Sequence, residues 1–119
     1  MTHAIRIHAQ GGPEVLRYEE VAVGAPGPGE ARVRHTAIGV NYIDTYHRSG
    51  QYKVALPSGI GMEGAGVVEA VGAGVDAVAP GDRVAYCNGP LGPYREARVM
   101  PADRLVKLPD GVADRVAAT

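Results

Sequence analysis

The 119-residue sequence contains no tryptophan and no phenylalanine, and it contains a single cysteine. Without the two largest apolar aromatic residues, a folded core has to be built from valine, isoleucine, leucine and alanine, with tyrosines partly buried at its edge. The lone cysteine, Cys87, excludes an internal disulfide bond and fits a reducing cytoplasm. It also excludes a structural zinc site made of four thiolates.

Long apolar runs and blocks of like charge are also missing. No run approaches the roughly 20 apolar residues that a membrane-spanning helix needs, and the N-terminus lacks the apolar segment of a signal peptide. Twelve basic and thirteen acidic residues give a net charge of −1, which provides no electrostatic footprint for nucleic acid. The sequence therefore predicts a one-domain cytoplasmic protein that binds neither membrane nor nucleic acid.

Glycine and proline, in contrast, are abundant, with 17 and 9 residues. They are interspersed with valine, isoleucine and tyrosine, so they mark turns between strands and do not form a disordered segment. Extended segments are predicted at residues 4–8, 16–23, 31–40, 62–71, 81–87, 94–100 and 104–108. The first two are expected to pair as a hairpin. Short strands joined by glycine and proline turns indicate an all-β barrel or sandwich.

Two segments depart from this strand pattern. Residues 41–50 predict a short helical turn that Asp44 caps and Gly50 ends. Residues 112–119 predict the beginning of a helix, because they are rich in alanine and contain no glycine or asparagine stop. A helix that runs to the last residue leads us to expect a truncated piece of a longer protein.

Several motifs match a functional pattern only in part. Residues 72–77 fit the letters of the dinucleotide fingerprint G-x-G-x-x-G/A, which binds a pyrophosphate only where a strand leads into a helix. Here Pro80 and Gly81 follow, and then a strand, so this motif is interpreted as a loop between strands. The four histidines lack metal-ligand spacing, and neither Ser49 nor Ser58 lies in a G-x-S-x-G motif. We therefore predict no metal site and no hydrolase triad.

Polar and aromatic residues concentrate at positions 41–46, just after the predicted strand 31–40. Two interpretations fit them equally well. They form either a capped surface turn whose tyrosines reach water or the rim of a pocket. In the pocket, Asn41 and Tyr46 supply hydrogen bonds, while Tyr46 and Tyr52 supply flat walls for an aromatic ligand. Glu63 lies in an otherwise apolar predicted strand, so it either pairs with a basic group or faces the pocket.

The order of several motifs carries a family resemblance. The glycine-rich segment 61–68 reads G-M-E-G-A-G-V-V, and G-D-R-V follows at 81–84. Upstream stand G-V-N-Y-I-D-T-Y at 39–46, R-S-G-Q-Y at 48–52 and G-G-P-E-V-L at 11–16. This order closely resembles the NADPH:quinone oxidoreductases, the zeta-crystallin-like branch of the medium-chain dehydrogenase/reductase superfamily, over essentially the whole chain.

The resemblance implies a mainly β fold. We expect residues 1–119 to form a GroES-like β-barrel catalytic domain with short helical turns, truncated before a Rossmann domain and inactive alone. The nicotinamide of NADPH would lie in the cleft between the two domains. Tyr46 and Tyr52 are the implied catalytic pair in a quinone pocket. The implied cofactor-binding residues form one loop: Asn41, Tyr42, Asp44, Thr45 and Tyr46.

The resemblance also implies a reaction without metal. Zinc alcohol dehydrogenases of this superfamily would need a thiolate near position 41 and an imidazole near position 62, where this chain has Asn41 and Met62. A quinone is already a strong hydride acceptor, so positioning it against NADPH can contribute about 7–11 kcal/mol. A tyrosine hydroxyl that stabilises the developing phenolate can add about 3–4 kcal/mol.

Two alternative functions remain. A 2-alkenal or enoyl reductase of the same superfamily would share this half of the chain, which does not determine the substrate. A stand-alone GroES-like binding module would need a mobile loop, and residues 50–59 are short for one. A homodimer is expected only for the full-length protein, and the choice of NADPH over NADH depends on residues outside this sequence.

Overall fold

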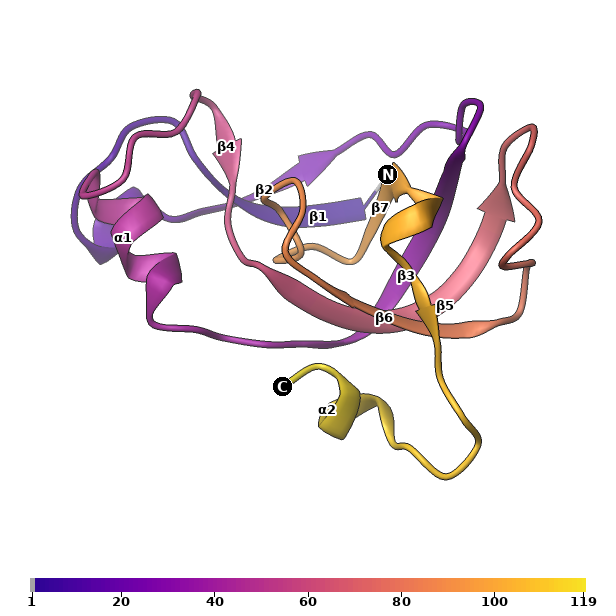
Figure 1. Cartoon of the computed structure of the whole chain (residues 1–119). Helices are drawn as coiled ribbons and strands as arrows, with labels where there is room; N and C mark the ends of the chain where they lie inside the picture. The colour runs from indigo at the N-terminus through magenta and orange to yellow at the C-terminus, as the bar shows by residue number, and fades with distance from the viewer. Residues whose placement is uncertain (1) are drawn as a thin grey trace.

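The computed structural model describes residues 2–119 as a fold made mainly of strands (Figure 1). The eight strands are β1 (Thr2–Ile7), β2 (Arg17–Val21), β3 (Glu30–Ile38), β4 (Ser58–Gly59), β5 (Glu63–Val71), β6 (Arg83–Cys87), β7 (Ala97–Pro101) and β8 (Val106–Lys107). The helices are α1 (Ile43–Ser49) and α2 (Asp114–Ala117), with 3-10 turns η1 (Pro13–Val15) and η2 (Ala102–Arg104). None of the helices formed by residues 2–119 has the length and apolar composition of a membrane span.

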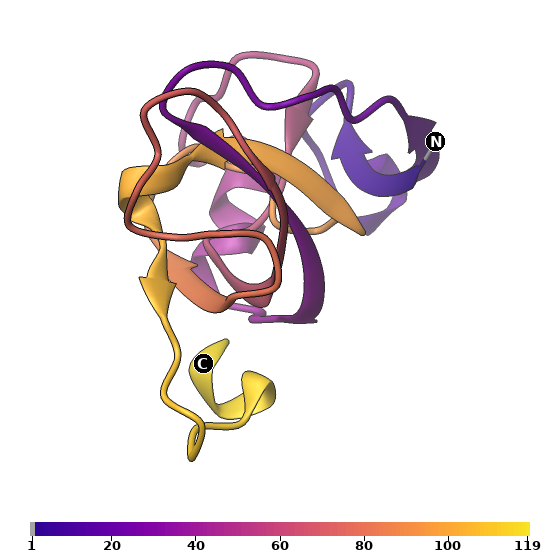
Figure 2. The same ribbon diagram turned by 90° about the vertical axis from the view of Figure 1, so that its right-hand side faces the viewer.

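The strands form two antiparallel sheets, one ordered β2-β1-β4 and the other β7-β3-β5-β6-β8. The predicted N-terminal hairpin is confirmed, since β1 pairs with β2 from Thr2↔Val21 to Arg6↔Arg17. An isolated pairing of Ala4 with Arg95 joins the two sheets. The strands of the larger sheet are strongly curved (Figure 2). The mainly β fold class expected from the sequence is therefore confirmed.

Strand β3 shows how the sequence separates the core from the surface. Side chains alternate between the two faces of a strand, so Ala31 and Val33 are fully buried. On the opposite face, the Arg32 and Arg34 Nε atoms donate to the two carboxylate oxygens of Glu69, at 3.2 and 2.9 Å. The solvent-facing side of β3 therefore carries two arginines bridged by one carboxylate.

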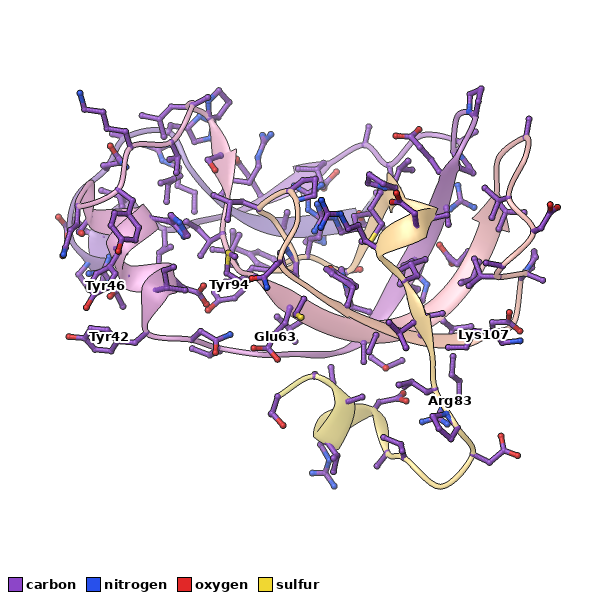
Figure 3. All side chains as sticks on the ribbon, viewed as in Figure 1. Tyr42, Tyr46, Glu63, Arg83, Tyr94 and Lys107 are labelled. Carbon is purple, nitrogen blue, oxygen red and sulfur yellow. The ribbon has the colours of Figure 1, made fainter. Side chains whose placement is uncertain are left out.

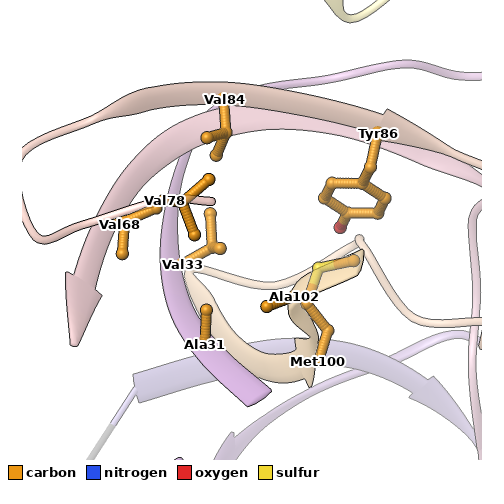
Figure 4. Packing of buried hydrophobic residues seen from close by; sticks show 8 residues of the cluster. All are labelled: Ala31, Val33, Val68, Val78, Val84, Tyr86, Met100 and Ala102. Atoms are coloured by element: carbon orange, nitrogen blue, oxygen red, sulfur yellow. The ribbon is translucent and has the colours of Figure 1, made fainter. Parts of the chain in front are cut away.

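The core cluster is small and mostly aliphatic (Figure 4). Tyr86, which is 6% exposed, is its one aromatic member, in agreement with a sequence that lacks phenylalanine and tryptophan. Valine side chains dominate, and each contributes roughly 1.5–3 kcal/mol when fully buried. The cluster consists of Ala31, Val33, Val68, Val78, Val84, Tyr86, Met100 and Ala102.

Some predicted boundaries are wrong, each for a local reason. The two-residue strand β4 was not predicted, because Ser58 and Gly59 have no apolar alternation and are extended only by pairing with β1. The segment 104–108 contributes only β8, since the turn η2 occupies its start. The interpretation of residues 72–77 is confirmed: they lie in the loop between β5 and β6, where Gly74 has a φ of +81°.

The predicted C-terminal helix is confirmed as α2, which lies below β3 and β5 (Figure 1). Its first residue, Asp114, accepts hydrogen bonds at 2.6 Å from both the Thr36 hydroxyl and the Arg83 guanidinium. The hydrogen bonds from Thr36 and Arg83 lower the pKa of Asp114, which keeps its carboxylate charged. The same guanidinium donates to the Val112 carbonyl at 2.5 Å. The position of α2 is thus set by hydrogen bonds to the sheet.

The side chains of His35, Tyr86 and Arg98 form a chain of hydrogen bonds at one end of the core. The His35 ring bonds the Arg95 carbonyl through Nδ1 at 2.8 Å, so that nitrogen carries the proton. Nε2 then accepts from the Tyr86 hydroxyl at 2.7 Å. The buried guanidinium of Arg98 donates to the Tyr86 oxygen at 3.3 Å and to the Pro90 carbonyl at 3.0 Å. Burial lowers the pKa of His35 to about 4, so the imidazole is neutral in the folded protein.

This neutral imidazole predicts a loss of stability in mild acid. Between pH 6.5 and about 4 the unfolded chain protonates His35 while the folded chain does not. The free energy of unfolding should therefore fall as the pH drops through this window, by up to about 3 kcal/mol from this group. Urea denaturation of the wild type and of His35→Gln across pH 4–7 measures this fall in the free energy of unfolding.

The variant should show a flatter pH dependence than the wild type. The control is His3→Gln, because the His3 imidazole is exposed and contacts Glu96 at the surface. Equal slopes for the wild type and His35→Gln would contradict the assignment.

Candidate functional site

The candidate site begins where β3 ends and the chain crosses to α1. Gly39 lies in this crossing, and its N–H donates to the Glu63 carbonyl at 3.3 Å. A Cβ at this position would collide with the Ala118 carbonyl oxygen and with the Glu63 side chain. Only glycine lets α2, β5 and the crossing segment approach this closely. The end of α2 is therefore packed directly against the start of the site.

The carboxylate of Asp44 holds the crossing loop together. Asp44 is 4% exposed, and its Oδ2 atom accepts the backbone N–H of Asn41 at 3.1 Å. The same oxygen accepts the Tyr94 hydroxyl at 2.6 Å. Burial, together with the adjacent carboxylate, raises the pKa of Tyr94, so this phenol remains a hydrogen-bond donor.

The prediction that Asp44 is the cap residue of this helix is wrong about its position. Tyr42 is the N-cap residue and makes no side-chain cap, whereas Asp44 acts from inside the first turn of α1. The predicted end of this helix at Gly50 is confirmed, with a φ of +96°. The helix starts where the reciprocal bonds between Asn41 and Asp44 close the turn.

Asn41 and Glu63 form the polar centre of the site. The Asn41 amide Nδ2 donates to Glu63 Oε2 at 2.5 Å, which assigns the amide orientation because a carboxylate only accepts. Among residues 2–119, no ion pair involves Glu63. Of the two alternatives for Glu63, pairing with a basic group is therefore not found: its partner is a neutral amide from the neighbouring loop.

Three tyrosines form an edge-to-face ladder beside this pair. The Tyr42 and Tyr46 rings lie 5.4 Å apart at 84°, and the Tyr46 and Tyr52 rings 5.5 Å apart at 73°. Gln10 holds the far end, where its amide donates to the carbonyls of His47 and Tyr52 at 3.0 and 2.9 Å. Tyr42 is 76% exposed and Tyr52 48%. The two ends of the ladder thus present aromatic surface to the solvent.

Figure 3 shows how these residues are distributed: Tyr42 and Tyr46 lie at the α1 end, and Tyr94 and Glu63 lie toward the sheets. A cavity of about 490 Å³ lies next to this group. Val40 and Tyr94 contribute to its wall, but Tyr46 and Tyr52 do not. The flat walls predicted for a pocket are therefore an open aromatic surface beside the cavity.

Two of the predicted cofactor-binding residues are engaged inside the protein. The Asp44 carboxylate is buried and holds the loop, and the Thr45 hydroxyl donates to the Tyr42 carbonyl at 2.6 Å. Asn41, Tyr42, Tyr46 and Tyr52 are the sequence-predicted residues left with partly exposed polar or aromatic surface. The Asn41 Oδ1 atom has no hydrogen-bond partner in the described part of the chain, so it can accept from a ligand.

Metal-ligand types do not gather at this site. Within residues 2–119 no three histidine, cysteine, aspartate or glutamate side chains are close enough to form a metal cluster. Cys87 pairs with Glu63 across β5 and β6, and its thiol is exposed. Met62 and Asn41 occupy the positions where we expected ligands in a zinc enzyme.

The sequence did not point to Tyr94 or Gln10. Tyr94 is 50 residues from Asp44, and Gln10 is 42 residues from Tyr52. No local spacing connects such partners, because the pairing of β1 with its neighbours and the β6–β7 loop bring them together. The one available signal for Tyr94 was its place in a predicted strand beside a cluster of glycines and prolines.

The fold and the loop define a GroES-like β domain with an aromatic edge. Residues 27–110 match the family described as the alcohol dehydrogenase GroES-like domain. The chain therefore belongs to this family. Its relatives include the quinone oxidoreductase of Pseudomonas aeruginosa, 56% identical over 94% of this chain and 35% of that protein. A 2-haloacrylate reductase from Burkholderia sp is 49% identical over 92% of this chain and 34% of that protein.

Solved structures agree with these relatives. The quinone oxidoreductase of Pseudomonas syringae pv. Tomato DC3000 superposes with a TM-score of 0.95 at 55% identity, over 99% of this chain and 37% of the other. The Escherichia coli quinone oxidoreductase complexed with NADPH superposes with a TM-score of 0.94 at 44% identity. The match covers 98% of this chain and 36% of the other. The resemblance to the quinone oxidoreductases is thus confirmed, and the chain spans about a third of the length of the curated relatives it matches.

The close packing at Gly39 gives a stability prediction. In Gly39→Ala, either α2 or the Glu63 side chain has to move, so we expect a loss of about 1–3 kcal/mol in the free energy of unfolding. Urea denaturation followed by circular dichroism measures it. Gly24→Ala is the matched control, because a Cβ there meets no atom within 4 Å. Equal stabilities for the two variants would show that Gly39 is not required for close packing.

Proposed function

We propose that this chain is the GroES-like domain of an NADPH-dependent quinone reductase. The observation that carries the proposal is the exposed edge formed by Asn41 and the tyrosine ladder, in a domain similar to quinone oxidoreductases. Flat aromatic rings suit planar ligands such as a quinone or a nicotinamide. The Asn41 carbonyl oxygen adds an acceptor that orients a polar substituent.

In this proposal the four partly exposed residues contact ligands, and Asp44 and Thr45 position them. Tyr42 and Tyr46 provide the surface against which the nicotinamide lies, and Asn41 accepts a hydrogen bond from it. The hydroxyls of Tyr46 and Tyr52 donate to the quinone oxygen on which negative charge develops. Asp44 and Thr45 keep the loop in place. NADPH, when bound, supplies the hydride.

The fit of this edge to a dinucleotide is limited to its nicotinamide end. Residues 72–77 form a loop between two strands, so they do not offer the helix N-terminus that a pyrophosphate needs. We propose that the phosphates are bound by a Rossmann domain, which the greater length of the relatives accommodates. Residues 1–119 alone should then give no NADPH turnover.

We also propose that the reaction does not use zinc. The Asn41 amide is bonded to Glu63, and the Met62 thioether is a poor ligand for this ion. Native protein should therefore contain far less than one zinc per chain by elemental analysis, and EDTA should leave quinone reduction unchanged. Stoichiometric zinc held inside the domain, with activity lost on chelation, would contradict this proposal.

The catalytic pair can be tested in a complete reductase that carries this domain. Replacing Tyr46 and Tyr52 together by phenylalanine removes both hydroxyls and keeps both rings. We expect kcat for quinone reduction to fall about 10²-fold, because one lost donor to a developing oxyanion costs about that much. The measurement is NADPH oxidation at saturating quinone.

The comparison variant is Tyr18→Phe, which removes a phenol from the wall of the cavity, outside the ladder, and should lower kcat less than the double variant does. Unchanged turnover in the double variant would remove Tyr46 and Tyr52 from the catalytic assignment, while leaving the family membership intact.

A second candidate function is reduction of an activated alkene. The observation in its favour is the similarity to a 2-haloacrylate reductase. Quinones and haloacrylates are both electron-poor conjugated acceptors, so the same hydride donor serves both. Comparing kcat/KM for a small quinone and for 2-chloroacrylate in the complete protein would separate the two functions.

A further inference from the structure

We infer that Tyr94 is the positioning residue that sets the geometry of Asn41 and Tyr46. This inference rests on the proposed function, in which those two residues contact ligands. Tyr94 itself lies between α1 and the sheets and does not belong to the tyrosine ladder (Figure 3). It acts through the carboxylate of Asp44.

Tyr94 is itself held rigidly by the sheets. Its N–H donates to the Ile60 carbonyl at 3.1 Å, and its carbonyl accepts the Ile5 N–H at 2.7 Å. The ring lies against the backbone of Gly61, where a Cβ would come within 2.6 Å of it. Gly61 has a φ of +109°, a conformation that favours glycine. The Tyr94 side chain is therefore held in place by the sheets and extends toward α1.

The Tyr94 hydroxyl reaches the carboxylate oxygen that closes the loop. Asp44 Oδ2 accepts both the Tyr94 hydroxyl at 2.6 Å and the Asn41 N–H at 3.1 Å. The other oxygen, Oδ1, is buried and has no hydrogen-bond partner among residues 2–119. Without the phenol, this buried carboxylate keeps a single donor, which strongly disfavours its present position. Tyr94 therefore decides where the Asp44 carboxylate lies.

Two short paths lead from this carboxylate to the proposed ligand-contacting groups. One path runs through the Asn41 backbone to its side-chain amide, which bonds Glu63 at 2.5 Å. The other runs along α1, because Asp44 and Tyr46 lie in the same helix. A shift of the carboxylate moves both groups together. Small displacements of this kind matter, because misplacement by about 1 Å can reduce a rate by about 10²-fold.

The test uses Tyr94→Phe, which keeps the ring against Gly61 and removes only the hydroxyl. In 1H–15N spectra of the 119-residue chain, we expect the backbone and side-chain amide signals of Asn41 to shift by more than their linewidths. Amide signals of β5 beyond residue 66 should stay in place. Tyr18→Phe is the matched control, because its exposed hydroxyl has no hydrogen-bond partner in the described chain. Unmoved Asn41 signals in folded Tyr94→Phe would overturn the inference.

The wild type decides the question if the variant does not fold. Both the Tyr94 hydroxyl proton and the Asn41 amide proton point at one oxygen, so they lie close together. We expect a slowly exchanging hydroxyl signal with a nuclear Overhauser effect to the Asn41 amide. A hydroxyl that exchanges freely with water, with no such contact, would overturn the inference.

Kinetics separate positioning from a purely structural role. In the complete reductase, Tyr94→Phe should lower kcat about tenfold with KM for quinone nearly unchanged, and Asp44→Asn combined with it should add little further loss. Wild-type kcat in folded Tyr94→Phe would overturn the inference. If the wild type reduces no quinone, the proposed function fails, and the spectra of the 119-residue chain still decide the role of Tyr94.

Discussion

The candidate site depends on one buried carboxylate. Asp44 has to remain in a place where water is excluded, and a carboxylate is stable there only when donors surround it. The loop backbone provides one donor and the phenol of Tyr94 provides another. This pairing links a short helix to the sheets across 50 residues of sequence. The positions of Asn41 and the tyrosine ladder follow from it.

The rest of the fold makes that pairing possible by bringing backbone segments unusually close. A core of valine and alanine side chains leaves little space between strands, and glycines at positions 39 and 61 let neighbouring segments touch. The buried guanidinium of Arg98 binds the Pro90 carbonyl and so anchors the β6–β7 loop, which leads to Tyr94. The absence of large aromatic side chains and the abundance of glycine therefore serve the same geometry.

The fold identifies the family of this chain, but it does not identify the substrate. The GroES-like fold is shared by relatives that reduce quinones and by one that reduces haloacrylates, so the fold itself does not select an acceptor. Within this domain, the surface around the ladder and the cavity of about 490 Å³ next to it are the two regions open to a ligand. Val40 and Tyr94 connect these two regions, because both line the cavity beside the crossing loop.

The sequence alone determined most of the strands, the turns between them and the family. Alternation in β3, the glycine and proline turns and the order of the motifs are local properties, so they can be predicted without coordinates. The partners of Asp44 and Glu63 were decided by the tertiary structure, since Tyr94 and Asn41 approach them only through strand pairing. Local patterns describe which face of an element is buried, but they do not describe which distant side chain meets it there. The ladder residues were therefore predictable from the sequence, but Tyr94, which positions them, was not.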